Sequence, residues 1–189
     1  MPPFNRLSKH LAAPLAAALY LLIWVSPILA DPAADMENKV KAWAMECQTE
    51  VASQMELLVS SGKLTIQQMF DTFYVPIPNT NPQQYHTKYD ALTDQTIQNI
   101  LDKYLEKDPK LFFVVAVDRN GYLPTHNSKS KDRSKRLFND RTGLAAARNT
   151  EPFLVQKYAR DTGETLYDLS VPLFVHKRHW GAIRFGYRL

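Results

Sequence analysis

Arginine side chains in the second half of the chain are the clearest candidates for binding chemistry. Arg141 and Arg148 flank a short segment of helical composition, DRTGLAAARN, and their spacing brings both to one side of a helix. A guanidinium presents a planar fork of N–H donors that matches a carboxylate or a phosphate. We expect these two arginines to face an anionic group; pairing of Arg141 with Asp140 or Asp118 is the structural alternative.

Tyr122 and His126 are candidates on the strand that follows an Asn120-Gly121 turn. Tyr122, Pro124 and His126 share one face of an extended strand, because successive side chains alternate. An imidazole at this place can donate a hydrogen bond to an anionic or carbonyl-bearing ligand. The structural alternative is a strand-end histidine that bonds to the following loop.

A proline-rich segment, YVPIPNTNPQQYHTKYD, supplies two further candidates. Its prolines fix the backbone and remove amide donors, so we expect an ordered strap. Tyr85 and His86 would close over the site from this strap, because rings with polar tips suit contact with a small molecule. The alternative is that these rings hold the strap against the core.

Sequence patterns of common catalytic and metal centres do not occur in the chain. There is no G-x-S-x-G or H-E-x-x-H pattern, and the 6 glycines form no phosphate-binding loop. Cys47 is the only cysteine, and it is not part of a C-x-x-C-H haem-attachment sequence. His176 and His179 are close in sequence, but a metal site requires three or four converging groups. We therefore expect a protein that is not an enzyme and holds no metal.

The first half of the chain must supply helices. Thr65 and Gln68 have capping-box spacing before a short helix, and a longer helix ends before Pro109. A helix of about 25 residues is predicted near the N-terminus, because apolar residues recur at steps of three and four. These residues are Val40, Ala44, Cys47, Val51, Met55 and Leu58.

The second half of the chain is β-rich. Leu111–Val117 is apolar on both faces, and Asn120-Gly121 is a strong hairpin signal. Three later segments, near 153–160, 165–175 and 183–189, have the composition or the alternation of strands. We predict an α+β fold, with a long N-terminal helix and a five-stranded antiparallel sheet with flanking helices. The strand at 111–117 is expected to be central.

Four segments, FDTFYVPIPNTNPQQYHTKYD, VAVDRNGYLPTHN, RLFNDRTGLAAARNTEPFLVQ and HWGAIRFGY, resemble the periplasmic ligand-binding region of bacterial methyl-accepting chemotaxis receptors. The resemblance covers nearly all of Asp35–Leu189, and the order of elements is that of a PAS-like, or Cache, sensor domain. In such a domain the second hairpin strand and the crossover line the pocket. The resemblance therefore implies that Tyr122 and His126 lie near it.

The function that the resemblance implies is non-covalent binding of a small, anionic or carbonyl-bearing molecule. Such a receptor continues into a second membrane span, a HAMP segment and a cytoplasmic coiled coil, and none of these follows Leu189. We therefore expect a sensor whose signal is read by a partner protein or by a homodimer formed through the long helix. The alternative function is a haem-binding redox or gas sensor with His126 or His86 as axial ligand, and a receptor remnant without a ligand is a third. The expected ligand-binding residues are Tyr85, His86, Tyr122, His126, Arg141 and Arg148.

Residues 1–30 have the composition of a secretory signal peptide. Arg6 and Lys9 precede the apolar run Leu15–Val25, and Ala30 suits cleavage. A retained anchor over residues 11–30 is the alternative. Both readings predict one sensor domain, residues 31–189, in the periplasm, either free or anchored to the inner membrane.

The charge of the chain does not indicate a nucleic-acid-binding protein. Removal of Arg6 and Lys9 with the leader lowers the formal net charge from +4 to +2. The basic cluster at 129–136 has no interleaved aromatic residues, and such clusters are usually solvated loops. We expect no nucleic-acid partner.

Overall fold

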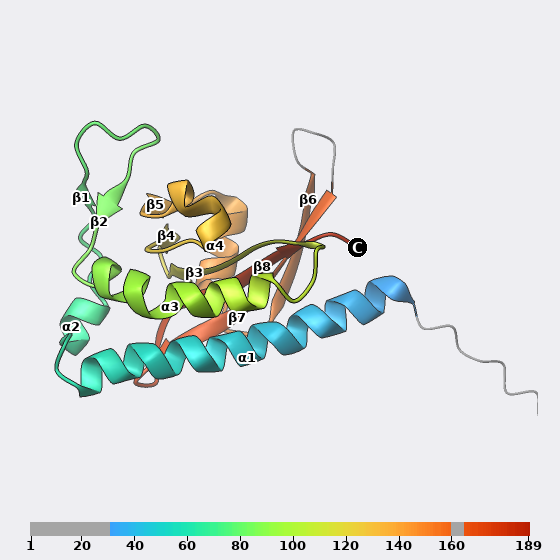
Figure 1. The fold of residues 1–189 in the computed structure, drawn as a ribbon, viewed down its shortest axis with the longest axis horizontal. Coiled ribbons are helices and arrows are strands. Elements are labelled where there is room, and N and C mark those ends of the chain that lie inside the picture. The colour runs from blue at the N-terminus through green and yellow to red at the C-terminus, as the bar shows by residue number, and fades with distance from the viewer. Residues whose placement is uncertain (1–30, 160–164) are drawn as a thin grey trace, which may run out of the picture.

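A long helix, α1 (Pro32–Ser60), runs along one side of the computed structural model, which describes residues 31–159 and 165–189 (Figure 1). The predicted leader, residues 1–30, lies outside the described residues. Asp31 caps the helix by accepting a hydrogen bond from the amide of Ala33 at 3.0 Å, and a proline suits the first helical position. The predicted apolar stripe is buried, Cys47 included, which confirms this helix.

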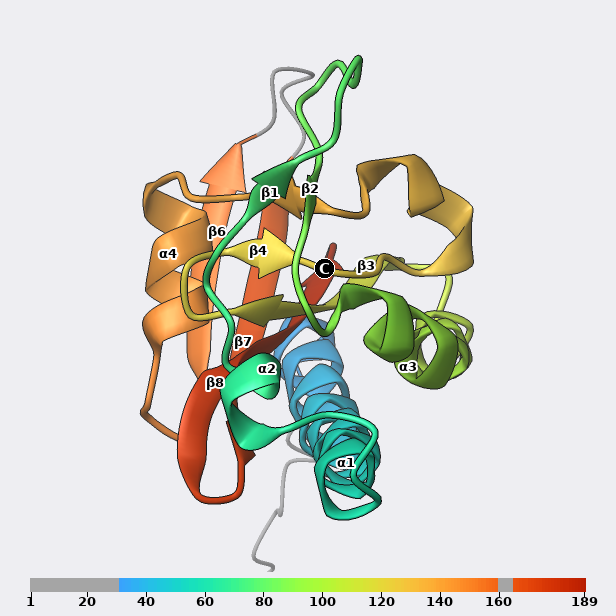
Figure 2. The ribbon, with the colours of Figure 1, turned by 90° about the vertical axis from the view of Figure 1, so that its left-hand side faces the viewer.

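Two further helices follow α1. The short helix α2 (Ile66–Met69) has the predicted capping box, since the amide of Gln68 donates to Thr65 Oγ1 at 3.1 Å and the amide of Thr65 donates to Gln68 Oε1 at 2.8 Å. The helix α3 (Asp90–Leu105) lies beside α1 (Figure 2). Together α1 and α3 form one helical layer.

The main sheet is four-stranded and antiparallel, in the order β3-β8-β7-β6. Two short ladders lie beside it, β1 with β2 in the strap and β4 with β5 above the sheet. The strands of the main sheet are β3 (Leu111–Asp118), β6 (Leu154–Ala159), β7 (Thr165–Val175) and β8 (Arg178–Tyr187). The short strands are β1 (Val75–Pro76), β2 (Tyr85–His86), β4 (Tyr122–Leu123) and β5 (Arg136–Leu137).

The α+β fold with flanking helices is confirmed, but the predicted five-stranded sheet with a central strand at 111–117 is corrected. β3 is the outermost strand of the four-stranded ladder. The chain does turn as expected, with Gly121 at φ +81°, yet it returns as β4, which pairs with β5. It meets β3 only through an isolated bridge between Val115 and His126. Pro124 contributes to this, because it has no amide hydrogen to donate to β3.

The two faces of the sheet are covered by different layers (Figure 2). On the α1 face, alternate residues of β7 such as Leu169 and Val171 join the large core with α1 and α3. On the α4 face, the helix α4 (Arg141–Arg148) covers a smaller apolar cluster. Asp168 and Arg184 also belong to the α4 face, because they alternate with the core residues of β7 and β8. The cluster consists of Val115, Val117, Leu123, Ala147 and Ala182.

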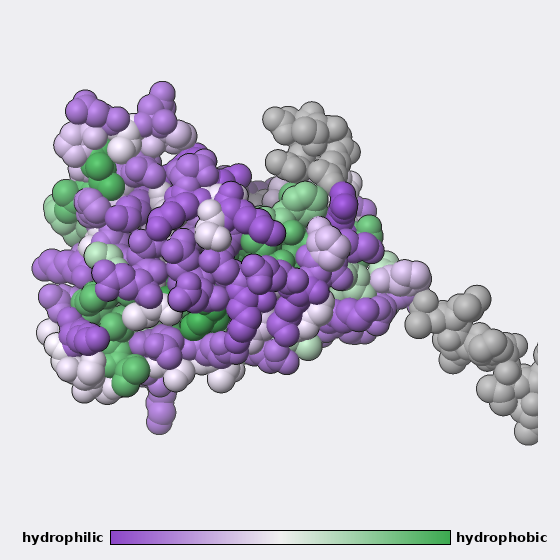
Figure 3. All heavy atoms as spheres, viewed as in Figure 1, coloured by the Kyte–Doolittle hydropathy of each residue, from purple (hydrophilic) through white to green (hydrophobic). Residues whose placement is uncertain are grey.

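The strap between α2 and α3, which carries β1 and β2, projects beyond the sheet (Figure 1). The side of the molecule drawn in Figure 3 is mostly polar, and apolar residues gather near the strap and near the end of α1. Phe73, Val75 and Leu57 are exposed large apolar residues of these segments. Of the helices within 31–159 and 165–189, none combines the length and hydrophobicity that a bilayer crossing requires.

Candidate functional site

A cavity of about 340 Å³ lies on the α4 face of the sheet, between the strands and the crossover that leads from β4 to α4. The crossover contains a 3-10 helix, η1 (Ser128–Arg133), followed by β5. Mostly apolar walls with a few polar groups are typical of small-molecule sites. The lining residues are Phe113, Val115, Leu123, His126, Arg133, Phe138, Asp140, Thr142, Tyr158 and Arg184.

The sheet side of the cavity contains an arginine whose charge is already compensated. Arg184 is 8% exposed, and its Nε donates to Asp168 Oδ2 at 3.1 Å, while a terminal nitrogen contacts the same oxygen. Asp168 is fully buried, so neither charge can be removed without leaving the other uncompensated. The guanidinium also lies 5.9 Å from the ring centroid of Phe113. Arg184 thus presents donors to the cavity but little net charge.

The ring of Phe113 occupies space that a side chain at Gly186 would fill. A Cβ atom at Gly186 would fall 2.1 Å from Cε1 of Phe113. Gly186 and Phe113 are register partners on β8 and β3, so the ring packs directly on the neighbouring strand. This close packing fixes one aromatic wall of the cavity.

His126 is a polar residue of the cavity wall, and two hydrogen bonds fix its backbone. Its amide donates to Ser134 Oγ at 2.8 Å, and its carbonyl accepts from Gln98 Nε2 at 3.3 Å. The residue is 4% exposed, and within the described residues Nδ1 has no hydrogen-bond partner. Burial lowers the pKa of the imidazole below its usual value and outweighs the neighbouring polar groups of Asn127, which raise the pKa; the charge of Arg133 lowers it further. The imidazole is therefore a neutral group with an open hydrogen-bonding position.

The crossover and α4 supply the opposite wall and the rim. Arg133 is exposed and lies with its Cζ atom 5.2 Å from the ring centroid of Phe138. Asp140 caps α4, with Oδ1 accepting from the amide of Gly143 at 2.9 Å. Thr142 follows in the first turn of the helix. This wall brings one cation, one capped carboxylate and one aromatic ring to the cavity.

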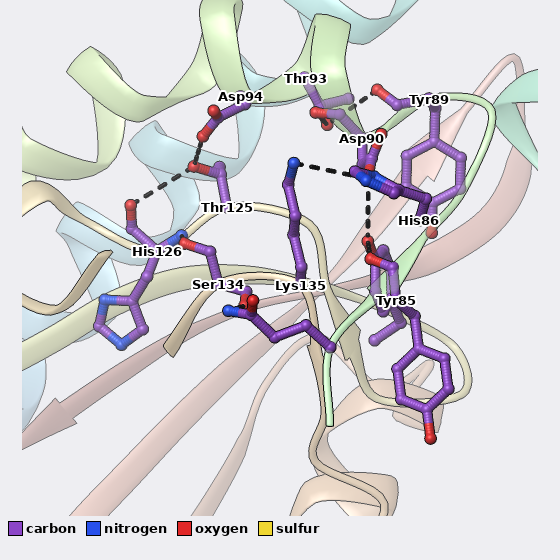
Figure 4. A network of polar contacts seen from close by, with 12 residues as sticks. Tyr85, His86, Tyr89, Asp90, Thr93, Asp94, Thr125, His126, Ser134 and Lys135 are labelled. Carbon is purple, nitrogen blue, oxygen red and sulfur yellow. Dashed lines mark hydrogen bonds and ion pairs between the residues drawn. The ribbon is translucent and has the colours of Figure 1, made fainter. Parts of the chain in front are cut away.

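Of the residues predicted from the sequence to bind a ligand, His126 lines this cavity, whereas Tyr122 does not. Tyr122 is fully buried, and its hydroxyl donates to the carbonyl of Tyr85 at 2.8 Å and lies 3.3 Å from Asp90 Oδ2. His86 lies on the strap with Nδ1 2.7 Å from the same carboxylate oxygen (Figure 4). Tyr122 and the strap residues Tyr85 and His86 contact one another or Asp90 and do not line the cavity. β4, which carries Tyr122, pairs with β5, and the segment meets β3 in a bridge four residues later, at His126.

The two predicted arginines also lie outside the lining of the cavity. Arg141 and Arg148 are exposed at the two ends of α4, and Arg148 Nε donates to the carbonyl of Arg119 at 3.3 Å. The helix does bring its first turn to the cavity, but through Asp140 and Thr142. Of the four residues expected to share one space, Tyr122, Arg141 and Arg148 do not join His126 in the lining of this cavity. The buried residues of α4 are Gly143, Ala146 and Ala147, which leaves both arginines outside. Their role in ligand binding stays a prediction.

Sequence reasoning missed Arg133, Phe138 and Arg184. Arg133 belongs to the basic cluster for which the sequence predicts a solvated loop, and the signal against that interpretation is Phe138, five residues further on. Arg184 is the one charged residue of the segment AIRFGY in the last strand. A charged residue in such a strand could have indicated that this face of the sheet borders a cavity. Within the described residues, no cluster of His, Cys, Asp or Glu side chains is suited to a metal ion. The haem alternative stays a prediction, with His126 in the cavity wall and His86 outside it.

Comparison with known proteins finds similar solved structures at low sequence identity. No family model and no curated protein matches the chain. An extracellular ligand binding receptor from Desulfohalobium retbaense DSM5692 is similar, with a TM-score of 0.45 and 13% identity, over 82% of this chain and 24% of that chain. The ligand-binding domain of the Pseudomonas aeruginosa PAO1 amino acid chemoreceptor PctC, in complex with GABA, has a TM-score of 0.33 and 14% identity, over 82% of this chain and 64% of that chain. The chain thus spans about a quarter of the first structure and less than two thirds of the second.

Proposed function

We propose that residues 31–189 form an extracytoplasmic sensor domain of PAS or Cache type, which binds a small molecule non-covalently in the cavity on the α4 face. The observation that carries the proposal is an aromatic-walled cavity of about 340 Å³ whose lining includes His126, a buried histidine with an unpartnered Nδ1. Buried polar groups are normally hydrogen-bonded, so an open position beside a cavity favours a ligand that completes it. The resemblance of the four sequence segments to chemotaxis receptors supports the same function.

A ligand in this cavity would connect the sheet to the crossover and the strap. The crossover is bonded to the strap, since the amide of Tyr85 donates to the carbonyl of Lys135 at 2.7 Å and Gln84 Nε2 donates to the carbonyl of Ser134 at 3.0 Å. Ser134 in turn accepts from the amide of His126 (Figure 4). A molecule that binds better to one arrangement of these segments shifts their equilibrium by its differential affinity. A partner protein, or a second copy of the chain bound through α1, then reads the change.

A cavity-filling substitution tests the proposal. Thr142 lines the cavity from the first turn of α4, whereas Ala145 of the same helix is exposed and outside the lining. We expect Thr142→Trp to weaken binding by about tenfold or more, equivalent to about 1.4 kcal/mol, and Ala145→Trp to leave it unchanged. The measurement is calorimetric titration of both variants with whichever small molecules raise the melting temperature of the wild type. Equal affinity of the two variants would contradict the assignment of function to this cavity.

A further inference from the structure

The charged side chains that face the cavity differ in whether a neighbouring group compensates their charge. Arg184 is paired with buried Asp168. Asp140 accepts a hydrogen bond from the amide of Gly143 and lies at the N-terminus of α4, where the helix dipole favours a negative charge. Arg133 forms no ion pair with a carboxylate of the described residues, and its guanidinium lies against the ring of Phe138. Among the charged side chains of the cavity lining within residues 31–159 and 165–189, the uncompensated charge is therefore positive and belongs to Arg133.

The second open group is His126. Its ring points to the side opposite Asp94 of α3 (Figure 4), and its backbone is fixed by the bridge to Val115 and by Ser134. The imidazole therefore cannot leave the wall without breaking these bonds. A neutral imidazole with an unpartnered nitrogen and a neighbouring guanidinium form a pair that an anion can bridge, since one donates permanently and the other donates once it is protonated.

We infer that the cavity takes its ligand as an organic anion held between Arg133 and His126, and that His126 takes up one proton when the anion binds. The inference rests on the proposed small-molecule function and adds the class of ligand and its linkage to pH. The proton comes from the solvent and binds to the ring nitrogen that lacks a hydrogen, so no other reactant is needed. The apolar body of the ligand lies against the rings of Phe113 and Phe138.

The direction of the linkage follows from the surroundings of the imidazole. Burial and the Arg133 charge hold the pKa of His126 below its usual value in the free protein, so the ring is uncharged at neutral pH. A bound anion favours the charged imidazolium and raises its pKa. Affinity for the anion therefore rises as pH falls between the raised pKa of the complex and the lowered pKa of the free protein. The other titratable or charged groups on the elements around His126 are of three kinds. Arg133, Arg184, Asp140 and Tyr158 line the cavity, Lys129, Lys131, Asp132, Lys135 and Arg136 lie on η1 or directly after it, and Asp94 and Asp102 lie on α3.

Matched probes test the inference directly. Phenylacetate, phenylacetamide and phenethylamine share one apolar body, as do isovalerate, isovaleramide and isopentylamine. We expect calorimetry to show binding of the acids in preference to the amides and amines. The affinity of an acid should fall by up to about tenfold per pH unit across a window between about pH 6 and 8.5, in which the probe itself stays ionised. Titrations in buffers of low and high ionisation enthalpy should show uptake of up to one proton.

Two arginines form a matched pair of variants. Arg133 and Arg136 lie 5.2 and 5.3 Å from the ring centroid of Phe138, yet only Arg133 is among the lining residues of the cavity. Arg133→Gln should weaken binding of the acids by about tenfold, as expected for loss of a charge-assisted hydrogen bond at an exposed rim. Arg136→Gln should stay within about twofold of the wild type, which corresponds to less than about 0.5 kcal/mol.

Replacement of the imidazole distinguishes proton uptake by His126 from binding of the anion. In His126→Gln, proton uptake should fall to near zero, and the pH dependence of affinity should flatten. Absence of binding by both acids, equal binding of acids and amides, or proton uptake that persists in His126→Gln would overturn the inference. Amide binding that Thr142→Trp abolishes would still support the proposed function, whereas probe binding that Thr142→Trp leaves unchanged would contradict that function itself.

Discussion

Two polar clusters lie near the turn between β3 and β4, and they differ in how completely their hydrogen bonds are made. The Asp118 cluster is saturated. Asp118 Oδ2 accepts from the hydroxyls of Tyr74 at 2.7 Å and Tyr89 at 3.0 Å, and Oδ1 accepts from the amides of Asn120 and Tyr122 at 2.9 Å each. Burial raises the pKa of this carboxyl, and the hydrogen bonds oppose that shift.

The cavity cluster is open. Nδ1 of His126 has no partner in the described part of the chain, Arg133 has no carboxylate paired with it there, and about 340 Å³ of space lies between them and the sheet. A satisfied network makes a fold specific, whereas an unsatisfied one beside space suits a ligand. The two clusters thus contain similar residue types and differ in unmet hydrogen-bonding capacity beside a cavity.

The largest expected effect is loss of stability when the saturated cluster is broken. In Asp118→Ala, the hydroxyls of Tyr74 and Tyr89 and the turn amides lose their acceptor. We expect the free energy of unfolding to fall by about 3 to 5 kcal/mol, because each buried polar group left unpaired costs about 1 to 3 kcal/mol and the exposed ones regain water. Urea denaturation measures the change. Asp132→Ala, on the exposed 3-10 helix, is the control and should cost less than about 0.5 kcal/mol.

A smaller effect is expected for Tyr122, the residue that sequence reasoning assigned to the site. Tyr122→Phe removes the hydroxyl that donates to the carbonyl of Tyr85 and keeps the ring, so unfolding should become easier by about 1 kcal/mol. Affinity for any ligand of the cavity should not change, since Tyr122 does not line it. A variant with wild-type stability but weakened binding would return Tyr122 to the site and remove the contrast between the clusters.

The parts of the fold that depend on local spacing were predictable. The buried stripe of α1, the capping box at Thr65 and the turn ending at Gly121 all follow from residues a few positions apart. The number of strands in the sheet was not predictable in the same way. It depends on whether the chain after the turn pairs with β3 or with β5, and β5 lies within the crossover, after a segment of irregular sequence.

Of the six residues that the sequence predicted for the site, only His126 is in the lining of the cavity, and its placement follows from strand alternation after a recognisable turn. Arg184 was not predictable, because its burial depends on Asp168, which lies on the adjacent strand at a register that sequence does not specify. The sequence predicts that Arg141 and Arg148 bind a ligand, because both lie on one side of a short helix and a guanidinium suits an anionic group. The small residues Gly143, Ala146 and Ala147, however, set the helix face that packs on the sheet, and this face leaves both arginines in solvent.

The smallest expected effect concerns the pH dependence of stability in the ligand-free protein. Burial lowers the pKa of His126 in the folded state, so below about pH 6.5, the usual value, the unfolded chain binds more protons than the folded protein. Stability gained from the neutral imidazole is therefore present above the unfolded pKa and is lost as pH falls through about 6.5 toward the lowered folded pKa.

The contribution of this one group has a slope of at most about 1.4 kcal/mol per pH unit, which is one proton. His179 acts in the same direction, because burial lowers its pKa too, so the wild-type curve alone does not isolate His126. The measurement is the free energy of unfolding of wild type and His126→Gln from urea titrations between about pH 5 and 8. As pH falls, the free energy of unfolding of the wild type should decrease relative to that of His126→Gln. In His179→Gln, the pH dependence that is due to His126 should remain. If the difference in free energy of unfolding is constant with pH, the imidazole has an ordinary pKa in the cavity wall. In that case water would have to bind the ring nitrogen of His126 in the free protein.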